Sequence, residues 1–257
     1  MIMQTPLKLA AIGVLALFAT ACASKVQSPV GADIRSAYAL VETRAALTEG
    51  ETVPDRYDRS VSDMVADPDA FTNDHGSRLA EFVEDHPGLS DDAGGERMLG
   101  FLIEEEAQAL AQGHFDGQRP ARLEVEVTST TFPNAATMML VGEVIAIAFD
   151  FTLVDAVTGD VLAESTQPIS PFVNRSAGAG GGLLGLALRG GGDTRHLMDL
   201  QAMASATSAM LNDILSGGEI DQFVNNRITV NPVPDAAAPA VSSAPDAADE
   251  QTAPVSR

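Results

Sequence analysis

The segment from residue 145 to residue 165 constrains the fold more than any other part of the chain. Its first half alternates large apolar residues with smaller or polar ones, which is the period of a β-strand with one face in a core. The turn sequence D-A-V-T-G-D follows at residues 155–160, and its glycine can adopt the positive φ that tight turns require. Residues 161–165 then return as the partner strand, so this pattern predicts a β-hairpin. The alternating residues are Ile145, Ile147, Phe149, Phe151 and Leu153.

Three further segments are expected to pack with this hairpin. Residues 123–127 alternate as L-E-V-E-V and predict a neighbouring strand, whereas residues 96–112 and 194–216 repeat apolar residues at helical spacing. An amphipathic helix needs an apolar surface, and the inner face of the hairpin offers one. The sequence therefore predicts an α+β fold: a small antiparallel sheet, made of the hairpin and the neighbouring strand, with amphipathic helices packed on one face. The helical stripes are Met98, Leu99, Leu102, Ile103, Ala107 and Leu110, and then Leu197, Leu200, Met203, Ala204, Thr207, Leu211 and Ile214.

The N-terminal third gives weaker signals. Residues 32–47 fit a helix, but a strand starting at Tyr38 fits as well. Residues 49–75 carry acids and prolines and are expected to be mostly loop, followed by a helix over 77–84. Beyond the hairpin, Pro168 and Pro171 are expected to end the sheet pairing, because proline cannot donate to a β-ladder.

Cys22 is the only cysteine in the chain, so it cannot form an internal disulfide. It follows an apolar run over residues 7–19 that is interrupted only by Lys8. The run is too short to span a bilayer, which takes about 20 apolar residues. A short apolar core behind a cation and ahead of small residues is typical of an export signal.

Thr20, Ala21 and Cys22 resemble the lipobox of bacterial lipoproteins, although Ala19 stands where that family usually has leucine. The resemblance implies cleavage before Cys22 and its lipidation. Ala23 and Ser24 then suit sorting to the periplasmic face of the outer membrane. The alternative is an ordinary secretory signal cut at an A-x-A site, with Cys22 incidental.

We expect four segments: a signal peptide over residues 1–21, a lipid-anchored tether over 22–31, a single α+β domain over 32–230, and a disordered tail over 231–257. The domain is best defined over 96–217. The tail is rich in Pro, Ala, Ser and acid, so it cannot bury enough surface to offset its ordering entropy.

The chain is strongly acidic, and this excludes classes of partner. Removing residues 1–21 takes away one cation, Lys8, and no acid, so the formal net charge changes from −21 to −22. Such a chain repels nucleic acid and anionic headgroups. Membrane attachment is therefore assigned to acyl chains on Cys22, each buried methylene contributing about 0.8 kcal/mol.

The run LVDAVTGDVLAES, together with the strand before it, the glycine-rich stretch after it and the closing helix, resembles the C-terminal half of uncharacterised lipoprotein families of Gram-negative envelopes. It is more distantly similar to auxiliary lipoproteins of envelope lipid transporters. The resemblance covers about residues 120–217 and implies no catalytic residues.

The glycine-rich segment over residues 178–192 places leucines between two glycine clusters. It lacks the Lys-Ser/Thr of a phosphate-binding loop, and Asp193 would repel a phosphate, so nucleotide binding is not expected. A plain crossover loop is one interpretation. The other is contact with an envelope protein, with a second copy of the chain or with lipid, because exposed apolar residues favour a partner. The candidate contact residues are Leu183, Leu184, Leu186 and Leu188.

No catalytic, cofactor or metal site is predicted. The four histidines show no H-x-x-x-H or H-E-x-x-H pairing, and no G-x-S-x-G elbow occurs. His75 and His86 have acids nearby in the sequence, but they are expected to be solvated loop residues. In the acidic run at residues 104–106, Glu104 and Glu105 are expected to face solvent and Glu106 to lie near the apolar stripe. Residues 91–96 lack the acid spacing of an EF-hand and are expected to cap a helix. The histidines are His75, His86, His114 and His196.

Two functions remain open. The first is a non-enzymatic, lipid-anchored lipoprotein that binds a partner or assists envelope assembly or transport. The second is a periplasmic module that binds lipid or a small ligand in a pocket between the sheet and the terminal helix.

Overall fold

The structure is a computed structural model that describes residues 24–67, 89, 93–132, 145–173 and 195–233. Several predicted features lie outside these residues: Cys22, the helix over 77–84, the proposed cap at 91–92, the glycine-rich segment with its four leucines, and the tail from residue 234 on.

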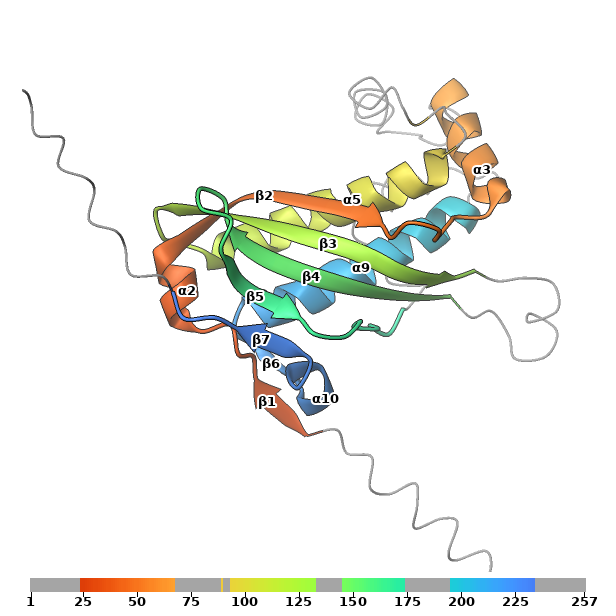
Figure 1. The fold of residues 1–257 in the computed structure, drawn as a ribbon. Helices are drawn as coiled ribbons and strands as arrows, with labels where there is room; N and C mark the ends of the chain where they lie inside the picture. Colours follow the sequence, from red (N-terminus) through yellow and green to blue (C-terminus); the bar gives the residue numbers. More distant parts are fainter. Residues whose placement is uncertain (1–23, 68–88, 90–92, 133–144, 174–194, 234–257) are drawn as a thin grey trace, which may run out of the picture.

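The described chain forms seven strands and six helical segments (Figure 1). In chain order they are β1 (Lys25–Gln27), α2 (Ala32–Ala37), β2 (Tyr38–Leu47), α3 (Asp55–Ala66), α5 (Gly94–Ala111), the 3-10 helix η3 (Gln112–His114), β3 (Arg119–Thr131), β4 (Ala146–Asp155), β5 (Val161–Ser165), α9 (Arg195–Leu215), β6 (Glu219–Asp221), α10 (Gln222–Asn225) and β7 (Ile228–Val230).

The main sheet has five strands in the order β2-β3-β4-β5-β7. The predicted α+β class is confirmed, but the sheet is larger than expected and mixed. The pairs β3–β4, β4–β5 and β5–β7 are antiparallel, whereas β2 runs parallel to β3. A parallel neighbour needs a crossover connection, and here the chain passes through α3 and α5 between the two strands.

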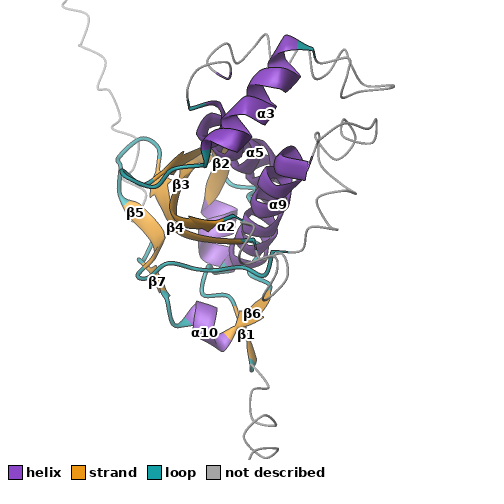
Figure 2. Cartoon of the chain, turned by 90° about the vertical axis from the view of Figure 1, so that its right-hand side faces the viewer, coloured by secondary structure: helices purple, strands orange, loops and turns teal. Residues whose placement is uncertain are grey.

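Helices α5 and α9 cover one face of this sheet, as predicted, and no described helix covers the other (Figure 2). All seven residues of the predicted α9 stripe are buried. The α5 stripe is also buried except for Leu110, which is 46% exposed and whose predicted burial was wrong. The space between the sheet and α9 is filled by side chains from both, including the fully buried Phe149, Leu200 and Met203.

The predicted hairpin is confirmed. Val161 pairs with Val154, and Gly159 has φ +79° at the turn. One carboxylate oxygen of Asp155 accepts the backbone N–H groups of Val157 at 2.8 Å and Thr158 at 3.1 Å, which closes the turn. Past β5, Ile169 still forms an isolated bridge with Phe149, so sheet contact continues between the two prolines.

In the N-terminal third, the alternative of a strand starting at Tyr38 is confirmed, because α2 ends at Ala37 and β2 begins at Tyr38. The other interpretation, a helix over all of residues 32–47, was wrong. The segment 49–75 was expected to be loop, yet it contains the helix α3. Pro54 precedes that helix, and Tyr57, Val61 and Met64 form its buried face.

The expected tether over residues 22–31 is part of the fold from Ser24 on. Lys25, Val26 and Gln27 pair with Asp221, Ile220 and Glu219 in a separate two-stranded sheet. The Ser28 hydroxyl donates to the carbonyl of Ile214 at 2.6 Å, and Val30 is fully buried. Three polar-rich residues carry no periodic signal, and their partner lies nearly 200 positions away, so the sequence offered no local cue. The tail also begins later than expected, since Asn231 still bonds to Val161 and Leu162.

Candidate functional site

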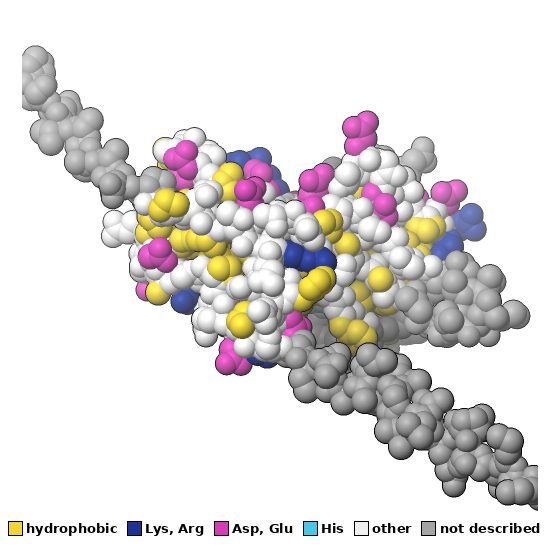
Figure 3. All heavy atoms as spheres, turned by 60° about the horizontal axis from the view of Figure 1, so that its bottom comes forward, with side chains coloured by type: hydrophobic (Ala, Val, Ile, Leu, Met, Phe, Trp, Pro, Cys, Tyr) yellow, Lys and Arg dark blue, Asp and Glu magenta, His cyan; other side chains and the backbone are white. Residues whose placement is uncertain are grey.

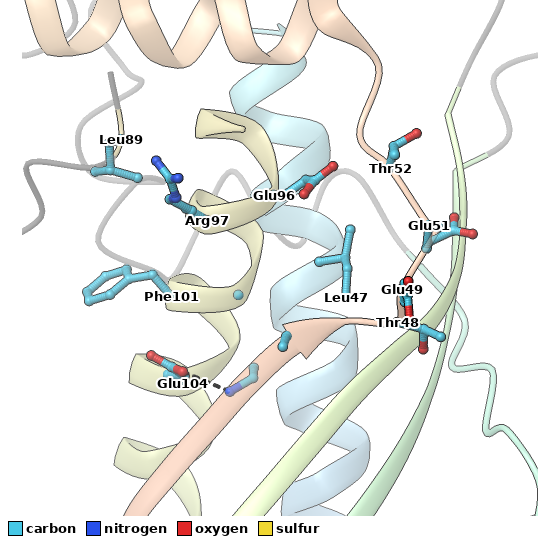
Figure 4. A pocket seen from close by; sticks show the side chains of 14 residues that line it. Leu47, Thr48, Glu49, Glu51, Thr52, Leu89, Glu96, Arg97, Phe101 and Glu104 are labelled. Atoms are coloured by element: carbon cyan, nitrogen blue, oxygen red, sulfur yellow. Dashed lines mark hydrogen bonds between the residues drawn. The ribbon is translucent and has the colours of Figure 1, made fainter. Parts of the chain in front are cut away.

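A cleft of about 660 Å³ opens between the end of β2 with its following loop and the first half of α5 (Figure 4). Its apolar lining includes Leu47 on β2, Phe101 on α5 and Leu89. Its polar lining is mainly acidic: Glu49, Glu51, Glu96 and Glu104, with Arg97 as the one cation among the described lining residues.

Glycines on α5 allow its close approach to the elements around the cleft. A Cβ at Gly100 would lie 3.0 Å from the carbonyl oxygen of Ala45, so α5 packs directly on the β2 backbone. A Cβ at Gly95 would lie 2.8 Å from Val53 and 2.9 Å from the Asp58 carboxylate. The backbone N–H of Gly95 donates to that carboxylate at 2.8 Å, which satisfies one of the free donors of the helix start.

The side chains of α5 also close the free edge of β2. Glu104 accepts the backbone N–H of Ala45 at 2.8 Å. Gln108 donates to the carbonyl of Leu40 at 3.3 Å and accepts the Thr43 hydroxyl at 2.8 Å. Unpaired backbone N–H and C=O groups at a sheet edge can pair with strands of other chains. Side chains of α5 occupy some of these groups on β2. Glu104 was expected to face solvent, but it is half-buried and bonded.

The carboxylates of the cleft differ in their hydrogen-bond partners. Glu104 is bonded to the β2 edge, and Glu51 accepts both the N–H and the hydroxyl of Thr130 at 2.7 and 2.6 Å. Figure 4 shows Glu96 directed from α5 toward Leu47 and Thr52, whereas Arg97 and Phe101 lie on the side of α5 nearer Leu89. The cleft thus combines an apolar lining with an excess of negative charge, which suits a ligand that has an apolar part and a cation.

A second hollow of about 650 Å³ lies along β2 toward the helix-free face of the sheet. Its polar lining again carries more acids than cations, with Glu124, Glu126 and Asp150 around Arg44. Arg44 and Arg122 each pair with a glutamate on their own strand, Glu42 and Glu124, at 2.7 Å. Both hollows share residues of β2, so this edge strand separates two acidic recesses.

Two clusters of titratable side chains hold the fold together away from the cleft. Asp155 accepts Arg119 at 2.5 Å and the Tyr38 hydroxyl at 3.2 Å. Its burial works to raise the pKa, but the backbone N–H groups of Thr158 and Val157, with Arg119 and Tyr38, outweigh that effect and hold the pKa below its usual value.

The second cluster joins α3 to α9. The Tyr57 hydroxyl donates to Asp199 at 2.9 Å, and both residues are 1% exposed. Burial, followed by the negative charge of Asp199, raises the pKa of Tyr57 well above its ordinary value. The ring of Tyr57 also contacts Phe132 and His196.

Two histidines lie within the described residues, and each is within hydrogen-bond distance of a side chain on another element. His196 lies on α9, and its Nδ1 is 2.9 Å from the Ser60 hydroxyl. His114 lies in η3, and its Nε2 is 2.9 Å from the side-chain oxygen of Asn212. His75 and His86 lie outside the described residues. Across the described ranges, no three His, Cys, Asp or Glu side chains are grouped so as to hold a metal ion.

Glu106 lies near the apolar stripe, as its position predicted. It accepts the side-chain N–H of Gln201 and the hydroxyl of Ser205 at the α5–α9 contact. Burial raises its pKa, and these two hydrogen bonds offset only part of that effect. Glu105, its neighbour, is exposed as predicted.

The cleft was not predicted from the sequence. Its two sides lie about fifty positions apart, and neither carries a recognisable motif. Gly100 in the interior of α5 was the available signal, because glycine in a helix interior costs about 1 kcal/mol and implies close packing. Within the described residues, no helix is both long and apolar enough to cross a bilayer.

Comparison with known proteins assigns the chain to no family. No protein family model matches the chain, and no curated protein matches it. One solved structure, the PelC dodecamer from Paraburkholderia phytofirmans, aligns at 11% sequence identity over 77% of this chain and 98% of its own chain. Its TM-score is 0.28, so neither a shared fold nor a function follows from the likeness.

Proposed function

We propose that this chain is a non-enzymatic lipoprotein of the cell envelope, anchored by acyl chains on Cys22 at the periplasmic face of the outer membrane. Its α+β domain binds a partner protein and so serves as an accessory component of envelope assembly or transport. The observation that supports partner binding is the acidic cleft between β2 and α5.

The chemistry of the cleft favours a basic, partly apolar segment of a partner. Its lining carries four carboxylates against Arg97, while Leu47 and Phe101 provide apolar surface. Like charges across an interface are unfavourable, so an acidic partner segment is disfavoured.

Strand β1, which closely follows the proposed anchor in the chain, and the cleft lie at different ends of the domain. In both Figure 1 and Figure 2, β1 and α10 lie at one end of the fold and α3 with the start of α5 at the other. A chain tethered next to β1 would therefore present the cleft away from its anchor. This arrangement suits an adaptor that is held at a membrane and reaches a partner in the periplasm.

Photo-crosslinking in intact cells tests partner binding. A photoreactive residue at Thr52, which is exposed and lines the cleft, should give a discrete adduct with a second protein. The same residue at Val157, which is 77% exposed on the hairpin turn, should give none. Glu96→Lys should abolish the Thr52 adduct, whereas Glu105→Lys, on the same helix but outside the cleft, should not. Absence of any Thr52 adduct contradicts the proposal.

Binding of a lipid or small ligand is the second candidate, and the size of the cleft favours it. Ligand pockets typically measure about 300–1,000 Å³, a range that includes this cleft. The expected location between sheet and α9 is filled by core side chains, so the cleft beside α5 takes its place. Organic extraction of the protein purified from membranes should recover a bound molecule if this function holds, and Glu96→Lys should reduce its yield.

The glycine-rich segment stays a separate prediction, since its leucines lie outside the described residues. If Leu184 and Leu186 contact the partner, replacing both by serine should abolish co-purification and leave folding intact. Unchanged co-purification would show that these leucines do not make the contact.

A further inference from the structure

Residues 24–27 and 219–227 form one surface, which we call the anchor-proximal face. The backbone N–H of Gln222 donates to the carbonyl of Ser24 at 2.9 Å, and the Ser24 hydroxyl donates to the Gln222 side chain at 2.5 Å. Strand β1 follows at once and pairs with β6. The chain is therefore fixed to the domain from Ser24 on, and no long tether separates the domain from Cys22.

Chain length then limits the distance between the anchor and this face. Each residue spans at most about 3.6 Å, so Cys22 lies within about 7 Å of Ser24. Acyl chains on Cys22 would hold that residue at the headgroup level of the bilayer. Whatever surrounds Ser24 on the surface of the domain must lie at the same level.

An exposed aromatic side chain stands at this place. Phe223 follows Gln222 in α10 and is 68% exposed, and the Arg227 guanidinium lies 4.0 Å from the centre of its ring. Arg227 also donates to the carbonyl of Pro168, which fixes its position. A single exposed phenylalanine is ordinary. Phe223, however, is next in sequence to Gln222, which binds Ser24, and the Arg227 guanidinium lies over its ring.

The charge of the face differs from that of the whole chain. It carries two cations, Lys25 and Arg227, and two acids, Glu219 and Asp221, and Lys25 pairs with Asp221 at 3.7 Å. The whole chain has a net charge of −21. Figure 3, turned so that this end comes forward, shows hydrophobic, basic and acidic side chains interspersed there. A locally neutral, partly apolar face suffers less repulsion from anionic headgroups than the rest of the acidic surface.

We propose that the anchor-proximal face rests on the phospholipid bilayer, with Phe223 inserted at the headgroup boundary and Lys25 and Arg227 facing the phosphates. This inference rests on the proposed acylation of Cys22 and adds an orientation to it. The acyl chains supply the affinity for the membrane, and the anchor-proximal face determines how the domain is oriented on it. The cleft at the opposite end is thereby directed into the periplasm.

Tryptophan fluorescence tests this orientation, because the chain has no tryptophan of its own. Phe223→Trp and, as control, Val157→Trp place one probe each at an exposed site. The full processed proteins, purified from membranes, are reconstituted into vesicles of phosphatidylethanolamine and phosphatidylglycerol, with or without brominated acyl chains. The probe at position 223 should shift its emission to shorter wavelength and be quenched by the brominated lipid, whereas the probe at 157 should show neither effect.

The outcomes separate this inference from the proposed function. If the protein floats with the vesicles but the probe at 223 behaves like the probe at 157, the acyl anchor stands and the orientation is wrong. If the protein carries no acyl chain and does not float, the anchor is wrong and the orientation falls with it. Matching circular dichroism of both variants and the parent shows that the exposed substitutions leave the fold intact.

Discussion

The carboxylate of Glu104 on α5 accepts the backbone N–H of Ala45 on β2 at 2.8 Å, so a helix side chain occupies the free edge of the sheet. The same helix can lie this close because Gly100 faces the Ala45 carbonyl oxygen. Two residues of α5, four positions apart, therefore position one wall of the cleft.

Replacing Glu104 by alanine should destabilise the protein by about 1–3 kcal/mol, because it leaves the Ala45 N–H without its acceptor. Glu104→Gln retains an acceptor oxygen and should lose less. Urea unfolding of both variants measures the difference. Glu105→Ala removes an exposed acid of the same helix and serves as the control; if it costs as much as Glu104→Ala, the edge bond is not the cause.

Gly117→Ala should destabilise the protein by about 3 kcal/mol or more, which is the upper range for overpacking. A Cβ there would overlap the carbonyl carbon of Ala37 and the amide nitrogen of Tyr38, and backbone atoms cannot rotate away. Gly113→Ala is the matched control, since a Cβ at Gly113 meets nothing within 4 Å. Thermal unfolding should separate the two variants clearly, and equal melting temperatures would show that the close approach is absent.

Asp155 should give a pH-dependent contribution to stability. Its pKa in the folded state is below the ordinary value, so the ionised form stabilises the fold above the unfolded pKa of about 3.9. That contribution is lost as pH falls through the lowered folded pKa. The difference in unfolding free energy between wild type and Asp155→Asn should therefore shrink as the pH falls from about 6 to about 3, the range over which carboxylates titrate. A constant difference would contradict this account; Asp213→Asn, on the exposed side of α9, is the control.

Glu106 should show the opposite sign. Burial raises its folded pKa above the ordinary value, so the folded state binds a proton more tightly and this contribution to stability is fully present below the unfolded pKa. It is lost as pH rises through the folded pKa, and the ionised group then opposes folding. Glu106→Gln should consequently raise stability at neutral pH relative to wild type, with a smaller gain in acid. Chemical unfolding at the two pH values measures this, and a loss at neutral pH would mean that its bonds to Gln201 and Ser205 outweigh burial.

Tyr57→Phe should destabilise the protein by about 1–3 kcal/mol, because it leaves the buried Asp199 short of one donor. The ring contacts with Phe132 and His196 are kept, so the loss reports the hydroxyl. In a double-mutant cycle with Asp199→Asn, the combined cost should be less than the sum of the single costs. Strict additivity would show that the two groups do not interact.

The parts of the fold that sequence predicted well are those whose signal is local. The α9 stripe has a clear helical period, and the hairpin around residues 155–160 combines a strand period with turn residues; both formed as predicted. Helix α3 had the signal too, since Tyr57, Val61 and Met64 repeat at helical spacing. The acids and prolines around these residues led to the segment being interpreted as loop.

The missed parts depend on partners far along the chain. Strand β1 exists because β6 is placed beside it, and its three residues carry no pattern of their own. The parallel pairing of β2 with β3 follows from the crossover through α5. No pattern within residues 38–47 predicts that pairing. The cleft is formed by that same pairing and by the glycines of α5, so it could not be assembled from either segment alone.

The central claim is that acyl chains on Cys22 hold this domain at a membrane, and mass spectrometry of the mature N-terminus from purified membranes tests it most directly. The account predicts a chain that begins at Cys22 and carries acyl chains on that residue. A chain that begins at Ala23, or one that retains a free thiol at Cys22, would contradict it.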